Sequence, residues 1–349
     1  MENRSDGRTG KRYKNGRKAA GARKDLADMF ELFRSAKIAE GRSTRTIEQY
    51  DEAWRRFTEY LTEEGIEHSV TAITPTLMRS YIAWLMHSRR RFADHPHKSD
   101  AEKTVGVSAV TANTIVKPIK TMFRFLHSEE IIDNNPCALV RKVKEAKKEI
   151  KIMSVDEMRL LISMPDKRTY AGFRDFVIMN VLIDTMARIN EVLSLRKEDI
   201  DIAKGFVNIS ETTTKSRRGR ATPIQRRTAQ LLKELMKECD DFDTDLVFVT
   251  NYGGPLRDDR FRDRLKGYVR AAGIETRIHP HLFRHTGATL FLENGGNERF
   301  LAELLGHADL RMVAKYTHLS SAAVKDKHTE FSPLNNVIGP LQKERKRKR

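Results

Sequence analysis

Residues 134–152, NNPCALVRKVKEAKKEIKI, constrain the fold of this chain more than any other stretch. A turn that contains proline is followed there by many charged side chains and few apolar ones, which is typical of a linker between domains. The chain has 349 residues, and a single hydrophobic core stops growing at roughly 250 to 300 residues, so two separate cores are expected. We therefore predict a linker at 141–153 between a first domain at 26–140 and a second domain at 154–320.

The balance of charge predicts a polyanionic partner. Lys and Arg number 65 against 48 Asp and Glu, which gives a net charge of +17 and an isoelectric point near 9.8. A membrane surface is the competing polyanion, but no apolar run approaches the roughly 20 residues of a membrane-spanning helix. No signal-peptide core follows the basic N-terminus either. Nucleic acid is therefore favoured over membrane.

The two ends of the chain and its cysteines indicate an intracellular protein with basic tails. Residues 1–25 are expected to be a disordered basic tail, and 321–349 a C-terminal segment that ends in a second basic tail, KERKRKR. Cys137 and Cys239 are the only cysteines and lie far apart, so neither a disulfide framework nor a zinc site is expected. The predicted location is the cytoplasm, on the nucleoid if the host is a prokaryote.

Helical periodicity dominates the first domain. Within 46–65 the apolar residues recur at helical spacing: Ile47, Tyr50, Trp54, Phe57 and Leu61. A second helix is predicted in 73–88, with Thr74 as its N-cap and Pro75 as its first residue. A third is predicted in 111–130, where Pro118 should either kink the helix or mark its real start. The polar residues between the last two, about 87–108, are expected to form a long loop.

The second domain is predicted to be mixed. Helices are expected at 154–164, 170–185, 188–195, 225–238, 257–272, 281–293, 297–305 and 309–316. Strands are expected at GFVNIS, RATPI and DLVFVT. The first two are joined through ETTTKSRRG, which predicts a hairpin with a basic tip. The expected fold class is α+β, mainly α with a small antiparallel sheet.

Several residues could do chemistry, and each also has an ordinary structural explanation. Arg188 and Glu191, three positions apart, could be an ion pair within a helix that contributes only a few tenths of a kcal/mol. Lys215 at the hairpin tip could simply be solvated, and Tyr316 could be a core aromatic residue.

A histidine pair raises the question of a metal site. His281 and His285 have the spacing of a zinc-binding helix, but Leu282 stands where a metalloprotease needs its glutamate base. A metalloprotease is therefore disfavoured, and no metal ligands are assigned.

Taken together, these residues resemble a known family. TMARINE, the hairpin with Lys215, HLFRH, LLGH and KYTH occur in the order and at roughly the spacing of the catalytic elements of the tyrosine recombinase (phage integrase) family. Residues 40–150, with STRTIEQY and the Asn-Pro turn, resemble its helical core-binding domain, so the resemblance covers about 26–320. It implies this catalytic set: Arg188 and Arg284 as the two arginines, Lys215 as the hairpin lysine, His281 in the HxxR signature, His307 at the His/Trp position and Tyr316 as nucleophile, supported by Glu191. The family usually has glycine where this chain has Met186, a change expected to alter how Arg188 is presented.

The chemistry of strand cleavage explains these residue types. Attack on a phosphodiester builds negative charge on its nonbridging oxygens, which the guanidinium groups of Arg188 and Arg284 can bind bidentately, while His307 donates a further hydrogen bond. A tyrosine hydroxyl with a pKa of about 10 needs a base such as His281, and Lys215 can protonate the departing 5′ oxygen. Such a site needs no metal or nucleotide cofactor, because these cations supply the charge and the phosphotyrosyl bond conserves the bond energy.

The resemblance also implies the function and the partners. It indicates a site-specific recombinase, the integrase or transposase of a mobile element, which integrates and excises DNA through a 3′-phosphotyrosyl intermediate. The partners would be double-stranded DNA core sites bound by a homotetramer on two duplexes, and an accessory DNA-bending or directionality protein could join them. Independently of the resemblance, basic residues at helical spacing indicate a DNA-binding face in 111–130. Six basic side chains are expected to bind DNA: Lys117, Lys120 and Arg124 on that face, and Arg45, Arg217 and Arg218.

Two other classes stay open. A DNA-binding regulator could keep the fold without catalysis, although every catalytic residue is present here. A type IB topoisomerase shares the chemistry but relaxes supercoils without exchanging partners, and it would relax plasmids that lack any specific site.

Overall fold

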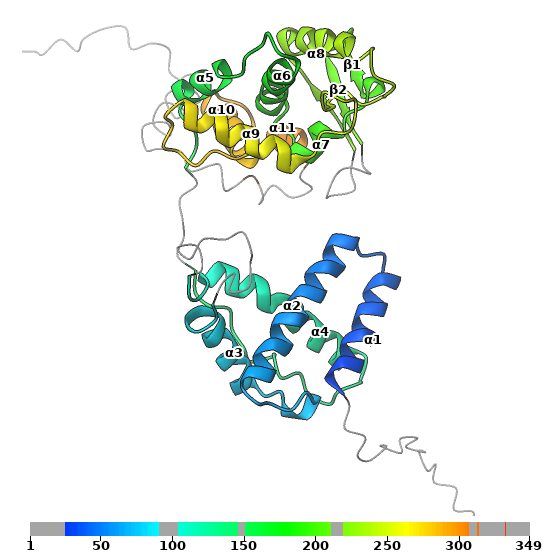
Figure 1. Cartoon of the computed structure of the whole chain (residues 1–349), viewed down its shortest axis with the longest axis vertical. Helices are drawn as coiled ribbons and strands as arrows, with labels where there is room; N and C mark the ends of the chain where they lie inside the picture. The colour runs from blue at the N-terminus through cyan, green and yellow to red at the C-terminus, as the bar shows by residue number, and fades with distance from the viewer. Residues whose placement is uncertain are drawn as a thin grey trace, which may run out of the picture. The chain divides into compact units, whose positions relative to one another are not determined.

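The computed structural model describes residues 25–90, 104–145, 151–210 and 219–306, together with Val313 and Ser332. The chain divides into two compact units, Met1–Lys148 and Glu149–Arg349 (Figure 1). Within the described ranges, no helix is long and apolar enough to span a membrane. The structure is mainly α-helical with a small antiparallel sheet, as predicted.

The first unit consists of helices around one core. Its described elements are α1 (Leu26–Ala39), α2 (Thr44–Glu63), the 3-10 turn Val70–Ala72, α3 (Pro75–His87) and α4 (Ala109–Ser128). The α3 helix begins at Pro75 as predicted, and the Thr74 side chain accepts a hydrogen bond from the backbone N–H of Leu77 at 3.1 Å.

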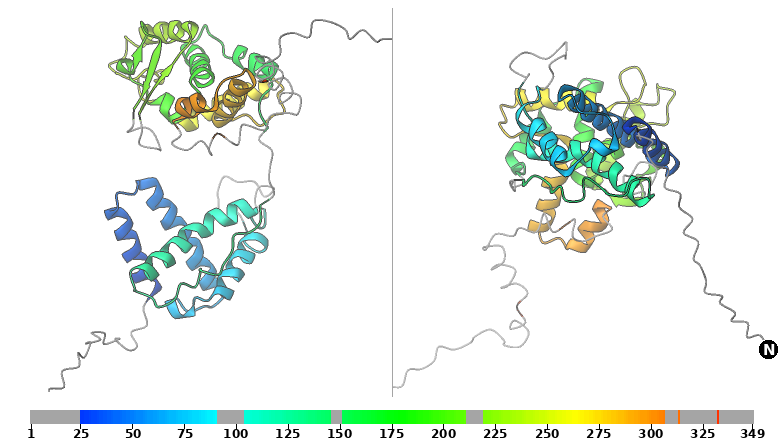
Figure 2. Two further views of the ribbon diagram at one scale, coloured as in Figure 1. Left: turned by 180° about the vertical axis from the view of Figure 1, so that it is seen from behind. Right: turned by 90° about the horizontal axis from the view of Figure 1, so that it is seen from below.

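Helix α4 organises the core of the first unit. It packs against α1, α2 and α3, an arrangement that can be followed in both views of Figure 2. Its first residue follows the N-cap Ser108, and the helix continues through Pro118. The alternative that Pro118 marks the start of this helix is therefore wrong. Proline removes one backbone hydrogen bond, but the buried face of α4, with Ile115, Ile119 and Met122, holds the helix together across that gap.

The second unit is built around α6, which is buried along most of its length. Its described elements are α5 (Val155–Ser163), α6 (Tyr170–Thr185), α7 (Ile189–Leu193), the 3-10 turn Lys197–Asp199, β1 (Ile200–Asp201), β2 (Phe206–Ile209), β3 (Arg220–Pro223), α8 (Arg226–Glu238), α9 (Asp258–Ala271), α10 (Pro280–Glu293) and α11 (Glu298–Leu305). Helices α5, α7, α8 and α10 all contact α6. The sheet lies to one side of α6 and α10 to the other (Figures 1 and 2). The predicted helices from 154–164 to 297–305 are thus present, whereas 309–316 lies outside the described residues apart from Val313.

The sheet has the order β1-β2-β3 with both pairs antiparallel. Strands β2 and β3 confirm the predicted hairpin, although its tip, 211–218, lies outside the described residues. The strand predicted at DLVFVT is wrong: this segment makes only isolated bridges, Arg196 with Leu246 and Val249 with Pro255. Val247, Phe248 and Val249 are all fully buried, so their burial does not alternate as it would in a strand with one face in the core.

Candidate active site

Arg188 lies at the junction of α6 and α7. Helix α6 ends at Thr185, and Met186 then adopts a left-handed conformation (φ 51°, ψ 24°) of the kind that glycine favours. Arg188 follows as the N-cap residue of α7. Its side chain is 26% exposed, so the guanidinium group is anchored in the protein but accessible to a ligand.

Glu191 fixes the orientation of Arg188. Its Oε1 accepts a hydrogen bond from Arg188 Nη1 at 2.7 Å, and its Oε2 accepts one from the Arg188 backbone N–H at 3.0 Å. The same Oε2 also accepts a hydrogen bond from Arg220 Nη2 at 2.8 Å. Burial alone would raise the pKa of the Glu191 carboxyl, but the hydrogen bonds and charges of Arg220 and Arg188 outweigh burial and lower it. Glu191 is therefore an ionised carboxylate shared by two arginines.

Arg284, on α10, connects the ends of two other helices. Its side chain is buried; Nη1 donates to the Met186 carbonyl at 2.8 Å and Nη2 to the Leu305 carbonyl at 2.7 Å. Carbonyl groups at a helix C-terminus lack partners within the helix and carry partial negative charge, so they suit a guanidinium ligand. Arg284 thus holds the turn that leads to Arg188 and also the end of α11.

His281 is the second residue of α10, one helical turn before Arg284. Although the side chain has access to solvent, desolvation lowers its pKa, and the positive charges of Arg284 and Arg188 lower it further. A neutral imidazole at pH 7 can accept a proton. The structure therefore brings Arg188, Arg284 and His281 together, from segments about a hundred residues apart, around a site suited to an anion.

Arg220 is a site residue that the sequence analysis missed. It is not among the residues expected to catalyse or to bind DNA, yet its side chain is 7% exposed and contacts Glu191. Strand register would have revealed it: Arg220 pairs with the buried Ile209, as the buried Thr222 pairs with Val207. Alternation along β3 therefore places Arg220 on the inner face.

Five predicted site residues lie outside the described residues, and their placement stays a prediction: Lys215, Arg217, Arg218, His307 and Tyr316. Their neighbours in the sequence are described. Gly306 ends α11 with a left-handed φ of 64° immediately before His307. Val313, three residues before Tyr316, is fully buried in a small core that also contains Met186 and Leu305.

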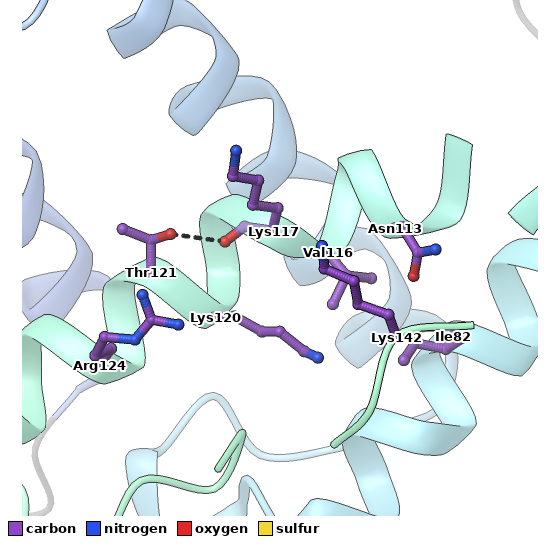
Figure 3. Close-up of a pocket in the computed structure, with 8 residues that line it drawn as sticks. All are labelled: Ile82, Asn113, Val116, Lys117, Lys120, Thr121, Arg124 and Lys142. Atoms are coloured by element: carbon purple, nitrogen blue, oxygen red, sulfur yellow. Dashed lines mark hydrogen bonds between the residues drawn. The ribbon is translucent and has the colours of Figure 1, made fainter. Parts of the chain in front are cut away.

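Three of the predicted DNA-binding residues line one pocket in the first unit (Figure 3). The pocket has a volume of about 240 Å³, and its lining is Ile82, Asn113, Val116, Lys117, Lys120, Thr121, Arg124 and Lys142. Lys120 donates a hydrogen bond to the Val140 carbonyl, and burial, followed by the charges of Lys142 and Arg124, lowers its pKa. Lys117 and Arg124 are exposed, whereas the exposed Arg45, near the start of α2, does not line this pocket.

Comparison with known proteins identifies both units. The model of the phage integrase SAM-like domain matches residues 26–148, and the model of the phage integrase family matches residues 151–323. Tyrosine recombinase XerD of Listeria monocytogenes serotype 4b (strain F2365) is 29% identical over 315 residues, which cover 88% of this chain and 99% of that protein. XerD of Staphylococcus aureus (strain N315) is 27% identical over 312 residues, which cover 87% and 97%.

Solved structures share the fold. One is the Tn1549 transposon integrase in complex with a circular intermediate DNA, with a TM-score of 0.68 and 15% identity over 88% of this chain and 99% of that chain. Another is XerH site-specific recombinase bound to palindromic difH substrate, with a TM-score of 0.65 and 18% identity over 87% and 84%. The chain belongs to the phage integrase family: it is a site-specific tyrosine recombinase, an enzyme that breaks and rejoins DNA strands.

Proposed function

We propose that Tyr316 is the nucleophile of this recombinase and that Arg188 and Arg284 bind the phosphate it attacks. The observation that carries the proposal is the cluster of two guanidinium groups and a histidine of lowered pKa, all held by α7, α10 and the turn at Met186. A pair of planar guanidinium groups matches a phosphodiester whose nonbridging oxygens gain negative charge during attack.

Each bond change then has a residue to support it. His281 accepts the proton of the Tyr316 hydroxyl as the oxygen bonds to phosphorus. The bond from phosphorus to the 5′ oxygen breaks, and Lys215 protonates the departing oxygen. His307 donates a hydrogen bond to the phosphate. The tyrosyl ester keeps the number of phosphorus–oxygen bonds constant, so rejoining needs only a 5′ hydroxyl and the reverse proton transfers.

The basic pocket of the first unit is our candidate for a DNA backbone contact. Lys117, Arg124 and Lys142 line a pocket whose positive charge suits a phosphate group. Phosphate contacts of this kind position a protein on a duplex without reading its sequence. Lys120 is expected to contribute less than the other two predicted residues on α4, because it already binds the Val140 carbonyl. Arg45, Arg217 and Arg218 remain candidates for further contacts.

For the biological setting, we propose the integrase or transposase of a mobile element, which integrates and excises DNA in the cytoplasm. A homotetramer on two duplexes, with an accessory DNA-bending or directionality protein, would allow two sites to exchange strands. Support comes from the shared fold with a transposon integrase in complex with a circular intermediate DNA. The XerD relatives are a reason to test a chromosomal site as well.

The test is covalent capture on a suicide substrate. Wild type and Tyr316→Phe are incubated in EDTA with nicked duplexes from the flanks of the encoding element, and the products are run on a denaturing gel. We expect a protein-DNA band with wild type and none with Tyr316→Phe. Tyr252→Phe is the matched control, because Tyr252 is 95% exposed, and it should behave like wild type.

The other outcomes are also informative. DNA binding without a covalent band on any flank would favour the catalytically silent regulator. A band that needs metal, or that persists in Tyr316→Phe, would refute the proposed chemistry. Efficient relaxation of plasmids without a specific site would favour a topoisomerase.

A further inference from the structure

We propose that Arg220 is a positioning residue for strand cleavage, which acts on the scissile phosphate through Arg188 and through the end of α11. The inference rests on the proposed function, since it takes Arg188 and His307 as phosphate ligands. Neither the motifs of the sequence nor the matches to known proteins assign Arg220 a role.

Arg220 shares the Glu191 carboxylate with Arg188. Arg220 Nη2 donates to Glu191 Oε2 at 2.8 Å, while Arg188 Nη1 donates to Oε1 at 2.7 Å. Glu191 is 1% exposed, so its carboxylate depends on these protein partners rather than on bulk solvent. Without Arg220 the carboxylate would be buried with one countercharge instead of two, and Oε2 would keep only the Arg188 backbone N–H. Arg220 therefore affects the orientation of Arg188 indirectly, through Glu191.

Arg220 also contacts the C-terminal end of α11. Arg220 Nε donates to the Leu304 carbonyl at 2.9 Å, and Arg284 Nη2 donates to the adjacent Leu305 carbonyl at 2.7 Å. Two guanidinium groups thus hold successive carbonyls at the C-terminus of α11, where the partial negative charge of the helix is greatest. Gly306 follows Leu305 directly, and His307 comes next in the sequence.

Gly306, at the end of α11, lies close to the Arg220 side chain. A Cβ atom at Gly306 would lie 3.2 Å from Arg220 Nη1 and 3.3 Å from Cδ, and the residue has a left-handed φ of 64°. The left-handed backbone favours glycine, and a Cβ atom there would have to displace the Arg220 guanidinium by a few tenths of an ångström. Arg220 Nη1 itself is buried and has no hydrogen-bond partner among the described residues.

Only arginine can make these contacts together. Its planar group presents Nε and Nη2 in a fixed fork, one to a carbonyl and one to a carboxylate, whereas a lysine is a single point charge. Arg220 is thus the one described side chain that hydrogen-bonds both Glu191 and the end of α11. Because Arg188 and His307 would bind the same phosphate, an error in their spacing should slow cleavage more than it weakens DNA binding.

The experiment compares Arg220→Lys, Arg220→Ala and the control Arg226→Ala, an exposed arginine at the start of α8. Equilibrium affinity for the core-site duplex and the single-turnover rate of covalent complex formation are measured for each. We expect affinity to stay near that of wild type and the rate to fall about 100-fold in both Arg220 variants, as a small misplacement of reacting groups does. Arg226→Ala should match wild type in both.

A second substrate separates positioning of the phosphate from protonation of the leaving group. In a duplex whose scissile 5′ oxygen is replaced by sulfur, the departing thiolate needs no proton, because a thiol has a much lower pKa than an alcohol. The Arg220 variants should stay slow on this substrate. Recovery to the wild-type rate would overturn the inference, since Arg220 would then act only on the hairpin that carries Lys215.

The remaining outcomes are equally decisive. A parallel loss of DNA affinity, melting temperature and cleavage rate in Arg220→Lys, which keeps the charge, would show a merely structural role and refute positioning. Wild-type cleavage by both variants would refute it as well. If wild type itself forms no covalent complex, it is the proposed function that fails. Glu191→Gln should slow cleavage similarly, and its combination with Arg220→Lys should slow it by much less than the product of the two effects.

Discussion

Met186 combines a strained backbone with a buried side chain at the turn before Arg188. A left-handed conformation costs a residue with a Cβ roughly 1–2 kcal/mol, yet Met186 is only 5% exposed and packs in the small core with Ala288 and Leu305. Gly287 on α10 provides the space, since a Cβ atom there would lie 2.8 Å from Met186 Cγ. Position 186 thus lacks the glycine that the family usually has, and the glycine at 287 leaves room for the Met186 side chain.

The contact between Met186 and Gly287 predicts that Gly287→Ala changes stability in opposite directions, depending on the residue at 186. Met186→Gly should lower the free energy of unfolding by about 1–3 kcal/mol, because the lost packing exceeds the relieved backbone strain. Gly287→Ala should destabilise wild type by about 1 kcal/mol or more through overpacking. In the Met186→Gly background, however, the same Ala should stabilise by up to about 1 kcal/mol, through its higher helix propensity. Urea unfolding of the four proteins measures this coupling, and additive effects would contradict it.

The pKa of His281 provides a second test. Its pKa is lowered by desolvation and then by Arg284 and Arg188, so in the DNA-free protein it should titrate below the ordinary value of about 6.5. Because protonation removes the proposed base, cleavage should be lost only as the pH falls below neutrality. NMR titration of Arg188→Ala should find the pKa of His281 raised. In the control Arg277→Ala, the pKa of His279 should rise instead, because Arg277 is among the charges that lower it.

Helices were the most predictable part of the fold. Caps mark their starts locally: Ser154 and Glu157 form a capping box at α5, and Thr169 caps α6. Strand β1 has two residues, too few for an alternating pattern, so it could not be predicted. The apolar run 247–249 was wrongly predicted as a strand of the sheet. A short segment that is buried on all sides is apolar at every position, and so is a strand buried on both faces, so the sequence pattern does not distinguish the two.

The candidate site was predictable where motifs carry it and not where tertiary contacts do. Arg188, His281 and Arg284 stand in short motifs of fixed spacing, and the structure gathers them. The role of Arg220 depends on Glu191 and on the Leu304 carbonyl, 29 and 84 positions away in the sequence. No local pattern encodes a contact at that separation, although the register of β3 would have indicated a buried arginine.

Each hydrophobic core consists of residues from one unit only. The core of the first unit lies within residues 26–140, and the two clusters of the second lie within 153–313. Two cores without shared residues are expected to unfold as separate cooperative units, so the whole chain should depart from two-state behaviour. The placement of the linker at 141–153 leads to the same expectation.

The two tryptophans make this prediction measurable, because Trp54 and Trp84 both belong to the core of the first unit or pack against it. In urea, tryptophan fluorescence should follow the first unit alone, whereas far-UV circular dichroism follows the helices of both. We expect two midpoints that do not coincide, and a fluorescence curve that the fragment 25–145 reproduces by itself. A single shared transition in the whole chain, or a fragment that unfolds at much lower urea than the intact protein, would mean that the units stabilise each other. The description of the chain as two independently folding units would then have to be abandoned.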